Sequence, residues 1–359
     1  MSVRFMAVGD IALHTKPEGQ NPFEFVGKTL GQADLVFGNL EVPLTGVRNP
    51  AMAKAESLRA PVEHGVFLRA ANVTVVNLAH NHIGDYGPEG VFETIDTVER
   101  AGVSCVGVGR TVTEALREAV VAVGGVSIAF IGFFEYGEEA SSSAVHIAGI
   151  NPQLVIHRVA DLARTYPFVA VSLHWGIENV YYPSPEQQSL ARACIDAGAT
   201  VVLGHHSHRF QGIEAYRGGI IFYSLGNFNF ARCGKKGAFS DLTAIVDITL
   251  RNDATVAYDL IPIRIGEDYR PRPMTNQNEM AEFRTHVEQI SQVLATNIGT
   301  WWWIGEIGGT YVTGNFKAYW KRIRRCGFGQ VIEMVRWLTG RFTIKCYIGI
   351  VRRWLTSRA

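Results

Sequence analysis

The hydrophobic positions of this chain fall into short, almost continuous runs that alternate with segments of helical spacing. The runs with the length and β-branched content of strands are Val3–Val8, Leu35–Phe37, Val73–Asn77, Ser127–Phe133, Val169–Leu173, Thr200–Leu203 and Ile220–Tyr223. Near-continuous apolar character is typical of strands that are covered on both faces. Strands of this kind separated by helices predict an α/β domain.

Helical spacing appears at Phe23–Gln32, Pro88–Ala101, Thr113–Ala119 and Pro185–Ala197. The last of these has the clearest ends. Ser184 can cap it, Gln187 completes a capping box, and Gly198 suits its C-terminal stop. We therefore expect this helix to deliver the chain directly into the strand at Thr200–Leu203.

The remaining third of the chain has a different pattern. Alternating residues at Thr243–Ile265, with Asn252 and Asp253 as turn formers, predict a β-hairpin. After Pro273 we expect a helix to about Asn297, then three consecutive tryptophans and a basic tail. We predict one domain over residues 1–272 and a helical, basic, Trp-rich extension over residues 273–359.

Composition narrows the class of protein. The chain has 359 residues, of which 47% are hydrophobic, enough for one large core or two modest ones. Its five cysteines are scattered without CxxC spacing, which fits a reducing compartment. The N-terminal sequence MSVRFMAVGD enters a strand at once, and no apolar stretch reaches about 18 residues. We expect no signal peptide, no spanning helix and a cytoplasmic location.

Charge is distributed very unevenly. Residues 317–359 carry eleven Lys or Arg and one acid, a net charge of +10, so residues 1–316 carry −9. Trp320, Trp337 and Trp354 lie among these arginines, and apolar residues at near-helical spacing follow Gly329. We expect residues 315–359 to lie on the inner face of a membrane, in short pieces broken by Gly327, Gly329, Gly340 and Gly349.

The alternative for this tail is a pair of helices packed on the acidic body, with arginines paired to its Asp and Glu residues. A nucleic-acid partner is not expected, because the acidic body would repel a phosphate backbone.

Polar residues gather where the predicted strands end. They include Asp10, Glu41, His80, Asn81, His82, Asp85, His174, His205, His206, His208 and Asn227. The carboxyl ends of strands form the ligand-binding edge of open α/β sheets. Carboxylates, an amide oxygen and imidazoles are ligands that Mn²⁺, Fe²⁺ or Zn²⁺ accept, and a carboxylate placed between two ions can bridge them.

The order of motifs GD, GNLE, NLAHNHIGDYG, HWGIE, GHHSH and YSLGNF resembles the poly-γ-glutamate capsule synthesis (CapA) family, a branch of the calcineurin-like metallophosphoesterases. The resemblance covers roughly residues 3–230. It implies a four-layer α/β/β/α sandwich with one or two divalent metal ions (Mn, Fe or Zn) on one rim.

The resemblance also implies roles for individual residues. It assigns the metal ligands as Asp10, Glu41, Asn81, His174, His206 and His208. Glu41 takes the bridging position. His82 takes the place of the histidine that contacts the scissile phosphate, and Asp85 could orient it.

This chain departs from the parent superfamily in two places. The usual Asp-x-His start is replaced by Asp10 with His14 four positions on, which leaves a His14 ligand open. The bridging residue is a glutamate instead of an aspartate. We expect the additional His80 and His205 to be supporting or structural, and Asn227 to lie at the rim.

Three functions are compatible with these motifs. The leading one is a metal-dependent enzyme with hydrolase-type chemistry on a peptide-like or γ-linked polymer, or on a phosphoester, in capsule or cell-surface polymer biosynthesis. One alternative is a metal-assisted epimerase of a peptide C-terminal residue, as associated with relatives in lasso-peptide pathways. The other is a non-catalytic assembly factor of a membrane-bound polymer synthase.

Overall fold

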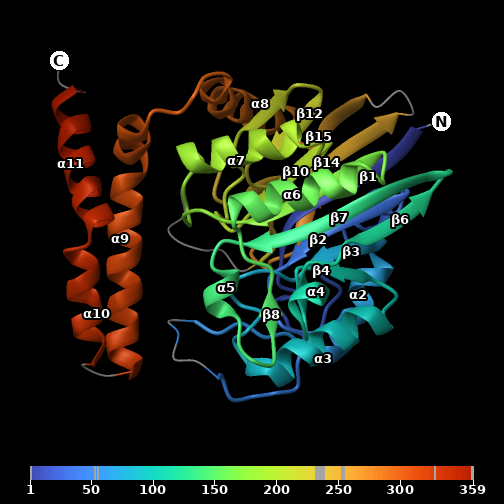
Figure 1. Ribbon diagram of the computed structural model, residues 1–359, viewed down its shortest axis with the longest axis horizontal. Coiled ribbons are helices and arrows are strands. Elements are labelled where there is room, and N and C mark those ends of the chain that lie inside the picture. Colours follow the sequence, from blue (N-terminus) through green and yellow to red (C-terminus); the bar gives the residue numbers. More distant parts are fainter. Residues whose placement is uncertain are drawn as a thin grey trace.

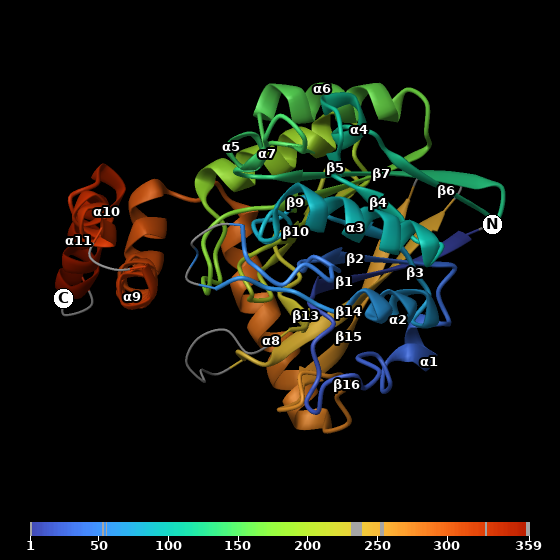
Figure 2. The same ribbon diagram turned by 90° about the horizontal axis from the view of Figure 1, so that it is seen from below.

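The fold is an α/β/β/α sandwich, as Figures 1 and 2 show from two directions. The computed structural model describes residues 2–51, 54, 56–230, 239–251, 255–326 and 329–356. Two sheets pack face to face, and helices cover their outer faces. The predicted fold class is therefore confirmed.

The first sheet is built on parallel strands from the N-terminal part of the chain. Its order is β16-β15-β14-β1-β2-β3-β4, and β13 also pairs with β1. Strands β1 to β4 run parallel, whereas β14 joins β1 antiparallel. The strands are β1 Ser2–Ile11, β2 Leu35–Leu40, β3 Val73–Asn77, β4 Ser104–Val106, β13 Asn227–Asn229, β14 Leu242–Arg251, β15 Val256–Ile265 and β16 Pro271–Pro273.

The second sheet has the order β11-β12-β10-β9-β7-β6. Its four inner strands are parallel, and each edge strand is antiparallel to its neighbour. The strands are β6 Ala119–Val123, β7 Val126–Phe134, β9 Phe168–His174, β10 Val201–His205, β11 Ile213–Tyr216 and β12 Gly219–Phe222; β5 Val108–Gly109 and β8 His146–Ile147 form a separate pair.

Aromatic residues fill the space between the sheets. Phe130 of the second sheet contacts Phe5 and Phe37 of the first, with ring centroids 5.4 and 5.6 Å apart. Helices α2 and α3 cover the first sheet, and α6 and α7 cover the second. The body helices are α1 Gly27–Leu30, α2 Gly65–Ala70, α3 Gly87–Arg100, α4 Val112–Ala115, α5 Gly137–Ala140, α6 Pro152–Ala163 and α7 Pro185–Asp196, with a 3-10 turn at Val62–His64.

Each predicted strand is present, although β1 and β2 run three residues beyond their predicted C-terminal ends and β10 runs two residues beyond its own. The capping box of Ser184 and Gln187 is confirmed. Two predicted helices are shorter than expected. Only Gly27–Leu30 is α-helical within Phe23–Gln32. The helix predicted over Thr113–Ala119 stops at Ala115, because Ala119–Val123 pairs with β7 as an edge strand.

The predicted hairpin at Thr243–Ile265 is confirmed by the antiparallel pairing of β14 with β15, while its turn at Asn252 and Asp253 lies outside the described residues. The helix predicted after Pro273 is α8 Gln277–Gln292, continued by a 3-10 turn at Val293–Ala295. Its Phe283 and Val287 join the core between the sheets. The division at residue 272 stays a prediction.

The C-terminal extension consists of α9 Thr300–Cys326, α10 Gly329–Leu338 and α11 Arg341–Thr356. Helices α9 and α11 lie side by side, with α11 on the far side of α9 from the body (Figures 1 and 2). The predicted breaks at Gly329 and Gly340 coincide with helix ends, and Gly327 lies outside the described residues. The predicted break at Gly349 is wrong: this residue lies inside α11, packed against Ile304 of α9.

No helix in the described part of the chain combines the length and the apolar character needed to span a bilayer.

Candidate metal centre

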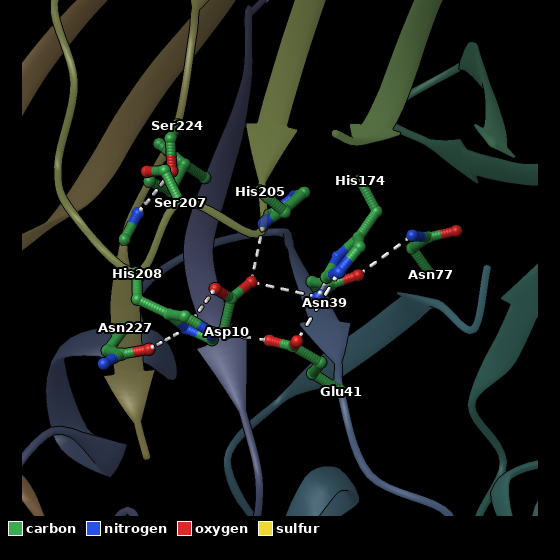
Figure 3. Close-up of polar contacts among 12 residues, drawn as sticks. Asp10, Asn39, Glu41, Asn77, His174, His205, Ser207, His208, Ser224 and Asn227 are labelled. Carbon is green, nitrogen blue, oxygen red and sulfur yellow. Dashed lines mark hydrogen bonds and ion pairs between the residues drawn. The ribbon is translucent and has the colours of Figure 1, made fainter. Parts of the chain in front are cut away.

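The carboxyl ends of strands from both sheets meet at one edge of the sandwich (Figure 3). Asp10 lies near the end of β1, and Glu41 follows the last residue of β2. His174 and His205 end the neighbouring strands β9 and β10, where they are paired in register. The close approach of β13 to β1 depends on Gly9, since a Cβ there would lie 1.9 Å from the Gly226 carbonyl oxygen.

One group of possible metal ligands consists of Asp10, Glu41 and His208, whose ligand atoms lie within 4.8 Å of one another. The Nδ1 atom of His208 is 3.5 Å from Asp10 Oδ2 and 4.0 Å from Glu41 Oε2. It is also 2.8 Å from the amide oxygen Oδ1 of Asn227. Asn227 was expected at the rim of the site, and in the structure its side-chain oxygen lies beside this group.

A second group consists of Glu41, His174 and His206, again within 4.8 Å. The Nε2 atom of His174 is 3.5 Å from Glu41 Oε1 and 2.9 Å from the amide oxygen of Asn81. The first group thus combines one imidazole, and the second group two, with a neighbouring asparagine oxygen and one oxygen of Glu41. The structure brings together the residues expected as ligands, with Glu41 common to both groups.

A row of amides behind these groups holds them in place. Asn39 Nδ2 donates to Asp10 Oδ1 at 3.0 Å and lies 3.2 Å from His174 Nδ1, while Asn77 Nδ2 donates to Asn39 Oδ1 at 2.9 Å. Neither Asn39 nor Asn77 was predicted to have a role in the site. The signal in the sequence was an asparagine at the end of each apolar run, and both amides are fully buried in the structure.

The histidine-rich loop after β10 has an unusual backbone. His206 and His208 both have positive φ, at 86° and 56°. Non-glycine residues adopt this conformation rarely, and it clusters at functional sites. His205 stays in the strand, with its Nδ1 atom 3.3 Å from Asp10 Oδ1. The positive φ angles turn the chain after it, and His206 and His208 each lie in one of the ligand groups.

The electrostatics of the site favour a bound cation. Burial lowers the pKa of His174 well below its ordinary value and that of His206 to about 4, so both imidazoles are neutral. Burial and the neighbouring Asp10 carboxylate raise the pKa of Glu41. Burial opposes ionisation of Asp10, but the nearby imidazoles of His205 and His208 outweigh it and leave its pKa below the usual range.

Several buried acceptor atoms in this centre have no hydrogen-bond partner among the described residues. They are Asp10 Oδ2, both carboxylate oxygens of Glu41 and Nδ1 of His206. Burying such atoms without a partner is costly, and a divalent cation in each ligand group would satisfy them. Neutral imidazoles with carboxylate and amide oxygens are a donor set that fits Mn, Fe or Zn.

His82 stands beside the ligand groups without belonging to either. Its Nδ1 is 2.7 Å from Oδ2 of the buried Asp85, the contact expected from the sequence. Asp85 also accepts from Lys54 Nζ at 2.5 Å and from the Leu58 amide at 2.8 Å. Lys54 was not predicted, because nothing in its irregular loop marks it. The His82 side chain remains 14% exposed, so a substrate can reach it.

Two other histidines lie outside both ligand groups. His14 Nε2 is 3.1 Å from the carbonyl oxygen of Arg59, away from the centre. His80 is buried, and its Nδ1 accepts from the backbone amide of His82 at 3.1 Å. The supporting role expected for His80 fits this contact.

Comparison with known proteins covers the body of the chain. The model of a family described as "Bacterial capsule synthesis protein PGA_cap" matches residues 4–232. "Capsule biosynthesis protein CapA" of Bacillus anthracis is 34% identical over 264 residues, which cover 71% of this chain and 63% of that protein. "PGA biosynthesis protein CapA" of Bacillus subtilis is 33% identical over 272 residues, covering 72% of this chain and 71% of that protein.

More distant matches have similar extent. A "probable polyglutamine synthesis accessory protein" of Mycobacterium tuberculosis is 27% identical over 286 residues, covering 74% of this chain and 75% of that protein. Among solved structures, the calcineurin-like phosphoesterase YfkN from Bacillus subtilis is 13% identical, with a TM-score of 0.46, and the match covers 82% of this chain and 98% of that one.

Proposed function

Because this chain belongs to the bacterial capsule synthesis protein family PGA_cap, we propose that it is a metal-dependent enzyme of capsule or cell-surface polymer biosynthesis. Its chemistry is hydrolase-type, on a peptide-like or γ-linked polymer or on a phosphoester. The observation that carries the proposal is Glu41, whose two oxygens face two separate groups of buried ligands.

Two divalent ions fit these ligands. Asp10, His208 and one Glu41 oxygen would hold the first ion, next to the oxygen of Asn227. His174, His206, Asn81 and the other Glu41 oxygen would hold the second. When bound, such a pair lowers the pKa of a water and stabilises negative charge on a substrate oxygen.

His82 is the residue that we propose to move a proton. Its Nδ1 is engaged by Asp85, which leaves Nε2 as the atom that can carry a proton toward a leaving oxygen. Lys54 balances the buried charge of Asp85, so the carboxylate can hold the ring in one orientation. His82 also lies close enough to His206 for its charge to lower the pKa of that residue.

The chemistry of the centre argues against a purely structural relic. A site kept only for assembly would gain nothing from acceptor atoms that are buried without partners. The complete ligand set, together with a partly exposed His82, supports catalysis.

The ligand assignment is tested by metal analysis of purified variants. Glu41→Gln should lose both ions, whereas Asp10→Ala and His206→Ala should each lose one, since each residue belongs to only one group. His157→Ala, which removes an exposed histidine on α6, is the matched control and should keep both. Full metal content in both Asp10→Ala and His206→Ala would overturn the assignment.

The reaction class is tested with the metal-loaded protein on a phosphodiester, on poly-γ-glutamate and on a linear peptide. Cleavage of one of them, abolished in Glu41→Gln, is the expected result. Exchange of the α-proton of a peptide C-terminal residue with solvent deuterium, without bond cleavage, would contradict hydrolysis and favour an epimerase.

A further inference from the structure

Helix α11 carries an apolar stripe on the face that points away from α9. Ile344, Ile348, Val351 and Leu355 follow the i, i+4, i+7, i+11 spacing that places residues on one side of a helix. Each exposes between 43% and 56% of its surface. A face this apolar is normally buried, so its exposure needs an explanation.

The opposite face of α11 already has its partner. Thr343 and Cys346 are buried, and a Cβ on Gly349 would lie 2.6 Å from the Ile304 side chain of α9. Arg353 of α11 pairs with Glu306 of α9 at 3.0 Å. Because this contact fixes the rotation of α11, the apolar stripe is directed away from the body.

Basic and aromatic residues border the stripe. Arg341, Lys345 and Arg352 lie along one side of it, at positions that are all exposed. Tyr347 and Trp354 lie along the other side, 37% and 52% exposed. Apolar residues flanked by arginines, lysines and interfacial aromatics are typical of helices that lie in a bilayer interface.

Part of this positive charge has no ion-pair partner in the part of the chain that the structure describes. Lys317, Arg324, Arg341 and Lys345 form no ion pair among the described residues, although the tail does pair Lys321 with Glu56 of the body. The alternative of arginines paired to the acidic body therefore accounts for only part of the tail.

We propose that the outer face of α11 docks on an anionic bilayer. Charge complementarity selects this partner over a second copy of the chain, because two stripes packed together would also bring two rows of Arg341, Lys345 and Arg352 together. The net charge of −9 on residues 1–316 would hold the body away from the same surface. The proposal concerns a surface remote from the metal centre and does not depend on the proposed chemistry.

Co-sedimentation of the full-length protein with vesicles tests the docking. At low salt it should bind vesicles that contain phosphatidylglycerol and release from them as salt rises, with little binding to phosphatidylcholine alone. The variant Ile344→Gln, Ile348→Gln, Val351→Gln keeps every charge and should bind about tenfold more weakly or worse.

A matched control is the variant Val66→Gln, Val112→Gln, which removes two valines that are 63% and 57% exposed on the body and should bind like the wild type. A second measurement needs no stripe variant. Brominated lipid should quench tryptophan fluorescence in the wild type, and the quenched fraction should be smaller in Trp354→Phe.

Three results would overturn the proposal: no binding of the full-length protein to phosphatidylglycerol vesicles at low salt, unchanged binding of the stripe variant, or a dimer in solution that the stripe variant converts to monomer. The last result would assign the stripe to a second copy of the chain.

Discussion

The metal centre and the C-terminal helices break the same rule of folding in opposite directions. At the strand ends, charged and polar groups such as Asp10 and Glu41 are completely buried. On α11, large apolar side chains such as Val351 and Leu355 are more than half exposed. Burial of polar atoms and exposure of apolar ones both raise the free energy of the isolated protein.

The difference shows what each region lacks. The buried carboxylate oxygens of Glu41 lack donors among the described residues, and a bound cation would supply the positive charge that they need. The stripe on α11 lacks an apolar partner, and the positive charge beside it indicates which kind of surface provides one. The first region needs a ligand of atomic size with fixed geometry, whereas the second needs an extended surface with little geometric demand.

The largest expected effect is on activity. His82→Ala should lower turnover by about 10²–10⁴-fold while both metal ions stay bound, because the proposed role of His82 is to move a proton without holding an ion. Steady-state kinetics with metal analysis of the same sample measures both quantities. Loss of metal together with activity would mean that His82 is a metal ligand and not a separate proton-moving residue.

Metal removal should affect the two regions unequally. Chelation should lower the free energy of unfolding of the body by about 3–4 kcal/mol if the Kd of the ions lies several hundredfold below their free concentration. Binding to anionic vesicles should not change, because no described residue of α11 contacts the centre. The test is denaturant unfolding and vesicle co-sedimentation, each with and without chelator; a loss of vesicle binding on chelation would show that the regions are coupled.

The acid sensitivity of the metal-free protein should come from the buried histidines. Burial lowers the folded-state pKa of His80, His174 and His206 below the ordinary 6.5, in the last case to about 4. Between pH 6.5 and about pH 4 the unfolded chain binds more protons at these histidines than the folded chain does. The free energy of unfolding is therefore undiminished above pH 6.5 and falls as the pH drops toward 4.

Glu41 opposes this trend, because its raised pKa lets the folded state keep a proton that the unfolded state releases above pH 4.5. Glu41→Gln should therefore steepen the acid loss by roughly 1.4 kcal/mol per pH unit. Chemical unfolding of both chelated proteins between pH 6.5 and 4.5 gives the two slopes. Equal slopes would mean that Glu41 is ionised in the metal-free fold.

The smallest expected effect concerns the packing of the tail. Gly349→Ala places a methyl group 2.6 Å from the Ile304 side chain and 3.1 Å from its backbone, so α9 and α11 must separate. We expect a loss of about 1–2 kcal/mol confined to the tail. Gly309→Ala is the matched control, since nothing lies within 4 Å of the added methyl and the helix should gain up to about 1 kcal/mol.

Thermal unfolding with limited proteolysis of the tail distinguishes these two variants. If Gly349→Ala is as stable as Gly309→Ala, the contact between the helices does not fix the rotation of α11, and the outward direction of the stripe loses its support.

Local patterns predicted an α/β domain with polar residues at its strand ends, and the family resemblance supplied the sandwich and the ligand assignments. Asp10, His174 and His206 each follow a run of apolar residues, and the ends of parallel strands meet at one edge whatever the details of the loops. Glu41 was assigned from its place in the GNLE motif. The structure places each of these side chains in the ligand groups.

The parts that were missed depend on contacts between distant segments. Ala119–Val123 has helical neighbours and becomes a strand only because β7 offers an edge for pairing. Lys54 reaches Asp85 across 31 positions from a loop without periodicity. Glycine lowers helix propensity, yet Gly349 stays helical because its missing side chain lets α11 approach α9 closely.

Anomalous diffraction from crystals of the metal-loaded protein tests the central claim most directly. The account predicts two peaks, one on each side of the Glu41 carboxylate and roughly 3.5–4 Å apart, with His208 at one and His174 at the other. Absence of metal density beside Glu41 in protein prepared with Mn²⁺, Fe²⁺ or Zn²⁺, or a single ion bound without it, would contradict the account.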